Sequence, residues 1–275
     1  MAVELATTSG NLEHEEDEQE QLLEEEECEE SPHETNCGVV NPYMNPRAQH
    51  GEAYEPTRLE HLANTFTHGI AIIPSLVITR ILIDAAYREL QQHLMVMYGF
   101  FTTLLFTAST AYHFCELLFR PDKRTLRYYL HITDRITIYF FIASSATPWL
   151  TLRHADTIGA HLKWIIWVIA LIGIAYQLKY HERYKTIETC FYVVVASIPY
   201  VGIITMNDRN GMPLMILGGL VYVVGTVFFK MDGIVPFAHA IWHLHVVVGA
   251  SIHTYAVYTS LIGPDPNNPM PPVEF

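Results

Sequence analysis

The stretch Phe237-Ala238-His239-Ala240-Ile241-Trp242-His243 opens the last apolar run of the chain, which continues to Ile262. A run of this length can cross a membrane as an α-helix, which needs about 20 residues. His239 and His243 are four residues apart, so on a helix both imidazoles leave the same face, one turn apart. Ionisable side chains are costly inside a membrane and usually mark a working site. Two imidazoles so placed can hold one metal ion, and the rest of the chain is expected to supply the partners of this pair.

Six further apolar stretches precede this one, each near the length needed to span a bilayer. Since no β pattern competes over these lengths, the sequence predicts an all-α, polytopic membrane protein with seven transmembrane helices. We expect the helices at about residues 64–84, 95–118, 132–151, 163–180, 187–205, 213–230 and 239–262, each boundary to within about four residues. A loop of about 13 residues then separates the second helix from the third. Gly218, Gly219 and Gly225 allow the sixth helix to pack closely on a neighbour.

The net charge of −13 is carried almost entirely by the start of the chain. Residues 1–60 hold 17 acidic and two basic residues, whereas residues 61–275 hold 12 acidic and 14 basic ones. A tail so rich in like charges and so poor in apolar side chains is expected to be disordered. The sequence therefore predicts a disordered acidic tail and linker over 1–55, a seven-helix membrane domain over 56–262, and a short lumenal or extracellular tail over 263–275.

The sequence gives no reason to expect a signal peptide, a disulfide framework, a cysteine zinc site or a nucleic-acid partner. The first 60 residues contain no apolar segment typical of a cleavable signal peptide, so the first spanning helix is expected to direct membrane insertion. The four cysteines show no paired spacing, which gives no reason to expect a disulfide framework or a cysteine zinc site. No nucleic-acid partner is expected.

Orientation follows from the basic residues near the helix ends, because cytosolic loops carry an excess of Lys and Arg. One side holds ten: Arg47, Arg58, Arg120, Lys123, Arg124, Arg127, Lys179, Arg183, Lys185 and Lys230. The other side holds five: Arg80, Arg88, Arg153, Lys163 and Arg209. The N-terminus is therefore predicted in the cytosol, and seven crossings place the C-terminus outside the cell or in a lumen.

Polar residues of three predicted helices share one depth near the cytosolic face. Ser109 and His113 lie four residues apart at the end of the second helix, and Asp134 lies in the first turn of the third. His239 and His243 occupy the first two turns of the seventh. Three neutral imidazoles with an open position are the pattern of a catalytic Zn²⁺ site. In such a site Asp134 is the expected general base or water-orienting group, and Ser109 donates to an oxyanion or fixes a ligand.

Each of these residues also has a simpler explanation. A single buried histidine in a membrane helix is more often hydrogen-bonded between helices than bound to a metal, and a serine often bonds its own helix backbone. Asp134 could pair with the adjacent Arg135, although sequence neighbours point about 100° apart on a helix. His245 and His253 of the last helix are interpreted as packing or lumenal residues.

A second polar row, Glu60, Asn64 and His68, runs in four-residue steps at the cytosolic mouth of the first helix. Either it is a polar helix entrance, or it caps this helix and forms the floor of the metal site. The spacing leaves both interpretations open.

Three of these motifs resemble those of the progestin and adipoQ receptor (PAQR) superfamily, which includes the hemolysin III-like proteins. They are Glu60-x-x-x-Asn64-x-x-Thr67-His68, Ser109-x-x-x-His113 with Asp134, and His239-x-x-x-His243. The resemblance covers about residues 44–262 and extends to Asn45-Pro46-Arg47-Ala48 and Pro148-Trp149-Leu150. The acidic tail lies outside it.

The resemblance implies seven helices with a cytosolic N-terminus, Zn²⁺ on His113, His239 and His243, and Asp134 holding the metal-bound water. It also implies kinship with alkaline ceramidases, which hydrolyse a lipid amide. The branch that the chain resembles most is associated with Golgi, late endosomal and lysosomal membranes, and with macrophage activation and growth signalling. An endomembrane location is therefore expected ahead of the plasma membrane.

Three functions fit these observations unequally. The first is membrane-linked signalling through zinc-dependent hydrolysis of a lipid amide or ester, with membrane lipids as ligand or substrate. The second is a non-catalytic receptor or scaffold for cytosolic signalling proteins, with structural zinc; the acidic tail and the basic loop Arg120–Arg127 favour such partners or anionic lipid. A pore ranks last, because the polar residues cluster at one depth and do not run through the membrane. The intact histidine and aspartate set favours retained chemistry.

Overall fold

The computed structural model describes residues 41–49, 54–153, 157–181, 183–204, 206 and 208–262, apart from the side chains of 157–160, 203 and 204. Over these residues the chain forms seven α-helices and a short π-helix, with no β-strand. In chain order they are α2 (Arg58–Ala85), α3 (Glu89–Phe119), α4 (Arg124–Leu152), α5 (Thr157–Tyr180), α6 (Lys185–Ile204), α7 (Met212–Phe229), α8 (Ala238–Val257) and η1 (Tyr258–Ile262). The all-α prediction is confirmed. The predicted disordered tail over 1–37 lies outside the described residues.

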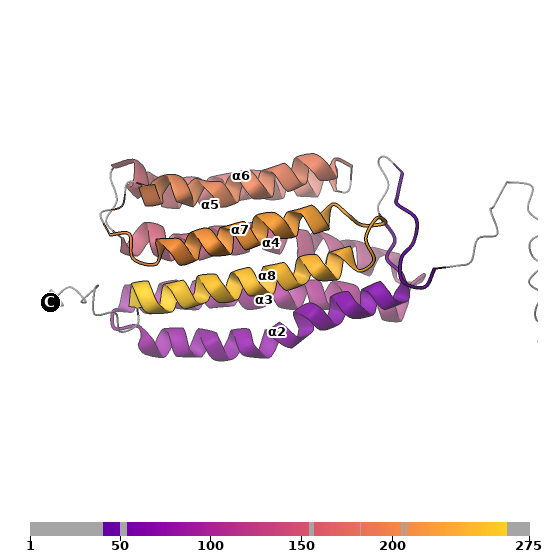
Figure 1. Ribbon diagram of the computed structural model, residues 1–275, viewed down its shortest axis with the longest axis horizontal. Helices are drawn as coiled ribbons and strands as arrows, with labels where there is room; N and C mark the ends of the chain where they lie inside the picture. The colour runs from indigo at the N-terminus through magenta and orange to yellow at the C-terminus, as the bar shows by residue number, and fades with distance from the viewer. Residues whose placement is uncertain are drawn as a thin grey trace, which may run out of the picture. The chain divides into compact units, whose positions relative to one another are not determined.

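The helices run alternately in opposite directions and pack side by side as one bundle (Figure 1). Each helix contacts the next in sequence, and α2 also packs against α8. The helix α4 is central, because it contacts α3, α5, α6 and α8. Among successive helices, α6 and α7 touch least. We call the end at which α2, α4, α6 and α8 begin the histidine end, because His239 and His243 lie there in the first turns of α8.

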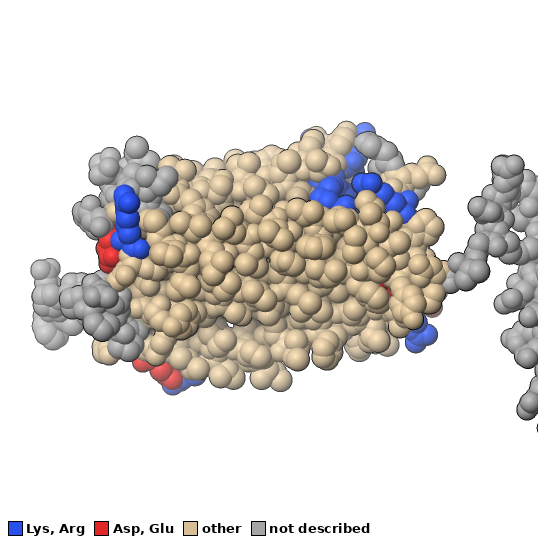
Figure 2. All heavy atoms as spheres, viewed as in Figure 1, with Lys and Arg blue, Asp and Glu red and all other residues tan. Residues whose placement is uncertain are grey.

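The side surface of the bundle is apolar. In Figure 2 the charged side chains of the described residues lie near the two ends of the visible face, with a broad uncharged band between them. Apolar side chains such as Phe66, which is 67% exposed, and Ile73, which is 72% exposed, point out of the bundle. Such a surface is unfavourable in water, whereas in a bilayer it contacts lipid tails.

Within the described residues, four helices meet the length and hydropathy expected of a membrane span: α2, α3, α7 and the part of α5 from His161 to Tyr180. The other three helices, α4, α6 and α8, carry polar side chains that lie buried or half-buried within the bundle. These are Asp134, Arg135, Glu188, His239 and His243. These polar side chains lower the mean hydropathy of the three helices.

Four helices begin earlier than the sequence predicted. The observed starts are Arg58, Glu89, Arg124 and Thr157, against predicted starts near 64, 95, 132 and 163. The predicted loop of about 13 residues is wrong, because only residues 120–123 separate α3 from α4. The prediction followed apolar composition, but a helix can continue beyond its apolar part where polar residues satisfy its first turn.

The start of α2 shows how such an extension is stabilised. The backbone N–H of Glu60 donates to Thr57 Oγ1 at 3.2 Å, and the backbone N–H of Thr57 donates to Glu60 Oε2 at 2.8 Å. This reciprocal pair is a capping box, which satisfies two backbone donors at the helix start. Glu60 therefore caps α2, which is one of the roles that the sequence left open for its row.

Glycines allow α7 and α8 to approach closely. A Cβ atom added to Gly225 would lie 2.7 Å from the Cβ of His245, and one added to Gly249 would lie 2.7 Å from the ring of Tyr222. Real Cβ atoms essentially never come this close, so larger residues would push the two helices apart. The close packing predicted for the sixth span is confirmed at Gly225 and places α7 directly beside the histidine-bearing helix.

Candidate metal centre

Three histidines from two helices converge at the histidine end of the bundle. One ring nitrogen from each of His113 on α3 and His239 and His243 on α8 lies within 4.8 Å of the other two. His113 and His243 are each 2% exposed, and His239 is half-buried. Small side-chain rotations would let one ion contact all three nitrogens. The structure therefore brings together the three residues that the sequence predicted as metal ligands.

Other groups already engage the Nδ1 atom of each histidine. His243 Nδ1 donates to the backbone oxygen of Asn64 at 3.2 Å, so its lone pair is on Nε2. His113 Nδ1 lies 3.1 Å from His61 Nδ1, and His239 Nδ1 lies 3.7 Å from Asp232 Oδ2. In this arrangement each Nε2 is left as the atom that can bind a metal.

The chemistry of this donor set fits a metal ion. His113 Nε2 is buried and has no hydrogen-bond partner among the described residues, which is costly for a polar atom unless something else binds it. Metal-binding imidazoles typically engage their second nitrogen with a carboxylate or carbonyl oxygen, as His243 does here, and the carboxylate of Asp232 lies near His239. The group can hold a metal ion, and the residues present suit Zn²⁺.

Helix α2 supplies further side chains around the three histidines, and His61 among them was not predicted there. His61 is 2% exposed and contacts His113 directly, and Thr67 Oγ1 lies 3.1 Å from His243 Nδ1. The ring of His68 stacks on that of His243, with 3.8 Å between the ring centroids. Of the two interpretations left open for the polar row of α2, the structure thus supports the one that places this row beside the metal site. His61 could have been found, because it lies three residues before Asn64 and seven before His68, on the same helical face.

Ser109 and Asp134 lie beside the histidines, as predicted. Ser109 is 1% exposed, and its Oγ lies 3.5 Å from His243 Nε2. Asp134 is 8% exposed and lines the same cavity as His239 and His243. The common depth of these five residues, inferred from helix direction alone, is therefore observed.

Arg135 has a carboxylate partner on another helix. Its Nη1 donates to Glu188 Oε1 on α6 at 3.0 Å, and the Tyr192 hydroxyl donates to the same oxygen at 2.7 Å. Arg135 also lies over the ring of Phe229, 4.9 Å from its centroid. These contacts join α4, α6 and α7 near the site, and they support the expectation that Arg135 points away from Asp134.

A cavity of about 350 Å³ reaches the histidines from within the bundle. His68, Asp134, His239 and His243 contribute to its lining, and most of the remaining wall is apolar. The lining also includes lipid-exposed side chains of α6 and α7, namely Val193, Ser197, Ile216, Leu220 and Val223. The cavity therefore opens sideways between α6 and α7, the two successive helices that touch least.

The two other histidines of α8 have the packing roles expected of them. His253 is buried deeper in the bundle, where Tyr98 Oη lies 3.2 Å from its Nδ1, and it lines the far part of the cavity. His245 Nδ1 lies 2.8 Å from the backbone oxygen of Ile241, and its ring stacks on Phe228. Neither belongs to the three-histidine group.

The chain before α2 packs across the histidine end. We call residues 42–49 and 54–57 the strap. The ring edge of Tyr43 contacts Phe237 with 6.3 Å between centroids, and Asn45 Nδ2 donates to the backbone oxygen of Glu55 at 2.8 Å. The Tyr54 hydroxyl donates to Glu60 Oε2 at 2.8 Å, and burial together with this carboxylate raises the pKa of Tyr54. This part of the predicted linker is therefore tied to the membrane domain.

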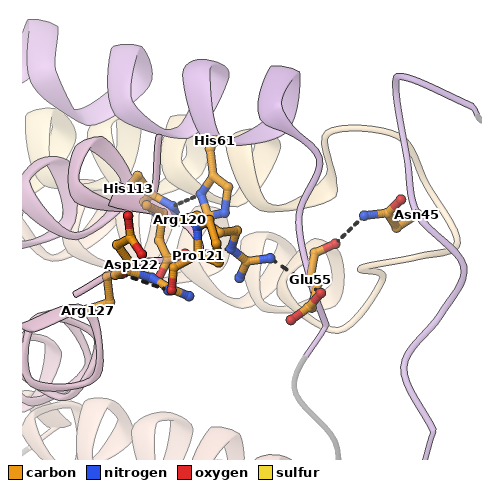
Figure 3. A network of polar contacts seen from close by, with 9 residues as sticks. Asn45, Glu55, His61, His113, Arg120, Pro121, Asp122 and Arg127 are labelled. Atoms are coloured by element: carbon orange, nitrogen blue, oxygen red, sulfur yellow. Dashed lines mark hydrogen bonds and ion pairs between the residues drawn. The ribbon is translucent and has the colours of Figure 1, made fainter. Parts of the chain in front are cut away.

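A charged network connects the strap to the end of α3 (Figure 3). Arg120 Nε and Arg127 Nε each donate to the buried carboxylate of Glu116 at 2.9 Å. Arg120 Nη1 also lies 3.4 Å from Glu55 Oε2 in the strap. Figure 3 shows this network beside the contact between His61 and His113.

This architecture defines a class of multi-pass membrane protein in which a bundle of seven helices buries a histidine group that could hold a metal ion. The sequence profile of the family described as "Haemolysin-III related" matches residues 57–254. The chain belongs to this family, which confirms the resemblance noted in its motifs.

Relatives from distant organisms support the assignment. "Monocyte to macrophage differentiation factor" of Homo sapiens is 40% identical over 219 residues, which cover 80% of this chain and 92% of that protein. "Hemolysin-3" of Bacillus cereus is 32% identical over 204 residues, which cover 72% of this chain and 90% of the relative. Neither name mentions a metal or a substrate. A bound metal ion and a substrate are therefore proposals for this chain.

Proposed function

We propose that this protein is a membrane-embedded, zinc-dependent hydrolase of a lipid amide or ester that acts in membrane-linked signalling. The cavity carries the proposal, because it joins the three-histidine group to the lipid-facing surface between α6 and α7. An acyl chain can enter by this route without leaving the bilayer. The volume of about 350 Å³ is within the usual range of small-molecule sites, about 300–1,000 Å³.

The residues around the histidines fit hydrolysis of a carbonyl compound. Zn²⁺, when held by His113, His239 and His243, lowers the pKa of a bound water to about 7 and polarises a carbonyl oxygen. Asp134 accepts a proton from the water that attacks the carbonyl carbon and passes it to the leaving nitrogen or oxygen. The bond from the carbonyl carbon to that atom breaks, which releases a fatty acid and an amine or alcohol. The Ser109 hydroxyl donates a hydrogen bond to the oxyanion or to Asp134.

The apolar wall of the cavity supports this chemistry. Leu105, Phe141 and Val246 line the cavity and exclude bulk water. Electrostatic interactions are stronger where water is excluded, so Asp134 and the histidines act with greater effect there. The wall also selects for an apolar substrate, because a charged or hydrated molecule would lose its water without compensation.

We further propose a cytosolic histidine end, an endomembrane location and cytosolic signalling partners. The count of ten basic residues against five favours a cytosolic histidine end. In that orientation the strap covers the water-facing end of the site, which leaves the lateral opening as the lipid route. An endomembrane location in the Golgi, late endosome or lysosome, and cytosolic signalling partners, rest on the family resemblance.

Metal analysis of the purified full-length protein, followed by hydrolysis assays, tests the proposal. We expect about one Zn²⁺ per chain and release of fatty acid from a panel of ceramides, fatty-acid amides and lysophospholipids. Asp134→Asn keeps the shape of the side chain but removes the carboxylate that acts as a base. The variant should therefore retain the metal while turnover falls about 100-fold or more. Asp84→Asn, at an exposed carboxylate that pairs with Arg80, is the matched control and should keep full turnover.

The outcomes separate the candidate functions. Protein purified without zinc and unable to bind it would reject the metal site. Zinc at one equivalent, with no turnover on any lipid of the panel, would reject the hydrolase and support a receptor or scaffold with structural zinc.

A further inference from the structure

The deep part of the cavity, away from the three-histidine group, carries two polar side chains. His253 of α8 and Tyr222 of α7 both line the cavity. A Cβ atom added to Gly249 would lie 2.7 Å from the ring of Tyr222, so this ring packs against α8 at the level of Gly249. Gly249 lies one turn before His253 on the same face of the helix. The two side chains therefore meet the cavity at neighbouring depths.

Tyr222 differs from the other hydroxyl-bearing residues of the cavity wall. The hydroxyl groups of those other residues each donate to an oxygen atom of the protein, at 2.7–3.0 Å. They belong to Ser145, Tyr192, Ser197, Tyr200 and Thr226. By contrast, the Tyr222 hydroxyl is buried and has no hydrogen-bond partner among the described residues. A buried hydroxyl without a partner is unfavourable, so a ligand atom that bonds to it would be stabilised here.

His253 has one ring nitrogen engaged and one available. Its Nδ1 lies 3.2 Å from Tyr98 Oη, and Thr254 Oγ1 lies 2.7 Å from the same tyrosine oxygen. Within the described part of the chain, His253 Nε2 forms no hydrogen bond. If Tyr98 donates to Nδ1, Nε2 carries the proton and is a donor; if Nδ1 donates to Tyr98, Nε2 is an acceptor.

We infer that Tyr222 and His253 form a second polar subsite, which binds a hydroxyl group on the chain of a lipid held in the cavity. A hydroxyl group both donates and accepts, so it can accept from Tyr222 and suits either tautomer of His253. A charged group does not fit, because Asp134 and Arg135 are the only Asp, Glu, Lys or Arg residues that line the cavity, and both lie near the histidine end.

The length of α8 indicates where on the lipid chain this hydroxyl lies. At a rise of 1.5 Å per residue, Gly249 is about 9 Å and His253 about 15 Å along the helix from His243. An extended chain advances about 1.2 Å per bond, so the hydroxyl is expected about 8–12 bonds from the group held at His243. This step rests on the proposed function, which places the reacting end of the lipid at the three histidines. The ligand class is a lipid with a hydroxyl group in the middle of its chain.

Native mass spectrometry of the purified full-length protein in detergent tests the inference. The probes are 10-hydroxyoctadecanoic acid and its isomer 2-hydroxyoctadecanoic acid, each titrated separately. The isomers have the same composition, and only the first carries its hydroxyl at the depth of the subsite. A net hydrogen bond corresponds to about a fivefold change in affinity, so we expect the 10-hydroxy acid to bind about fivefold more tightly or better.

Tyr222→Phe is the test variant, because it removes only the hydroxyl that lacks a partner. It should lower the preference for the 10-hydroxy acid about fivefold. Tyr200→Phe is the matched control, since the Tyr200 hydroxyl lines the same cavity but donates to the backbone oxygen of Met215 at 2.8 Å. We expect the control to keep the preference within about twofold. His253→Leu should lower the preference as Tyr222→Phe does.

Thermal unfolding without added lipid gives a second measurement. The unfolding midpoint should not fall in Tyr222→Phe, which loses no hydrogen bond, whereas it should fall in Tyr200→Phe, which loses one. Tyr222→Phe alone tests the inference if His253→Leu fails to fold. A lower midpoint in Tyr222→Phe would assign its hydroxyl to the structure of the bundle and overturn the inference.

Three binding results would also overturn it: equal affinity for the two isomers, an equal loss of preference in Tyr222→Phe and Tyr200→Phe, or no binding of either acid. The proposed function can fail separately. A preference for the 10-hydroxy acid in a protein that binds no zinc and hydrolyses no lipid would reject the hydrolase and support the subsite. Lipid hydrolysis without this preference would reject the subsite alone.

Discussion

Replacement of His61 by alanine should weaken zinc binding although His61 is not itself a predicted metal ligand. His61 Nδ1 lies 3.1 Å from His113 Nδ1, and both side chains are buried. In the proposed metal site this contact fixes the ring orientation of His113 and leaves its Nε2 to bind the ion. In His61→Ala the Nδ1 of His113 has lost this partner inside the bundle, and its ring can rotate or change tautomer.

Two typical magnitudes, the cost of a lost buried hydrogen bond and the effect of losing an outer partner of a metal-bound histidine, give the expected loss of zinc affinity. Removal of one partner of a buried hydrogen bond typically costs about 1–3 kcal/mol. Loss of an outer partner of a metal-bound histidine typically lowers metal affinity about 10–100-fold, which corresponds to about 1.4–2.7 kcal/mol. The two ranges agree, so we expect zinc affinity to fall by about 10–100-fold in His61→Ala.

Competition with a chelator of known affinity measures this change in the purified protein at fixed pH. His61→Gln, which restores a hydrogen-bonding amide near the same position, should recover part of the affinity. His245→Ala is the matched control, because His245 lies two residues from His243 but stacks on Phe228 away from the site. The absorption spectrum of the cobalt-substituted protein should change in His61→Ala and not in the control. Zinc affinity within twofold of the unmodified protein, or an equal loss in the control, would refute the reasoning.

Three further predictions concern the metal site, the membrane topology and the acidic tail. Any one of His113→Ala, His239→Ala or His243→Ala should lower metal content and thermal stability together, because metal binding contributes to folding; about one equivalent of metal in every variant would reject the site. A tag after Phe275 should be protected from protease added outside sealed vesicles that expose the cytosolic face, and cleavage there with a shielded N-terminal tag would reverse the topology. Deletion of residues 2–37 should leave the membrane domain folded, since that segment is highly charged and poor in apolar residues; aggregation of the truncated protein in detergent would contradict this.

Helical spacing and span direction were enough to predict the centre of the site. The four-residue steps from Ser109 to His113 and from His239 to His243 determine which side chains share a face. The alternation of the spans determines which helix ends meet, and so Asp134 could be placed at the same depth. These are local properties of an apolar sequence, and the structure reproduces them.

The partners around this centre could not be predicted in the same way. The contact between His61 and His113 depends on how α2 is rotated and placed beside α3, which hydropathy does not specify. The cavity depends on the separation of α6 from α7 and thus on the packing of many side chains. Helix starts such as Arg124 were missed because polar residues can continue a helix beyond the apolar core of the membrane.

The buried pair of Arg135 and Glu188 has a consequence for how this protein is made. The two charges lie on α4 and α6, 53 positions apart in the chain, so the arginine is synthesised well before its partner. A buried charge without its partner typically costs about 3–5 kcal/mol. Release of α4 into lipid is therefore unfavourable until α6 has emerged from the ribosome. The nascent chain should keep α4 at the insertion machinery, shielded from the hydrocarbon, until both helices enter the bilayer as a pair.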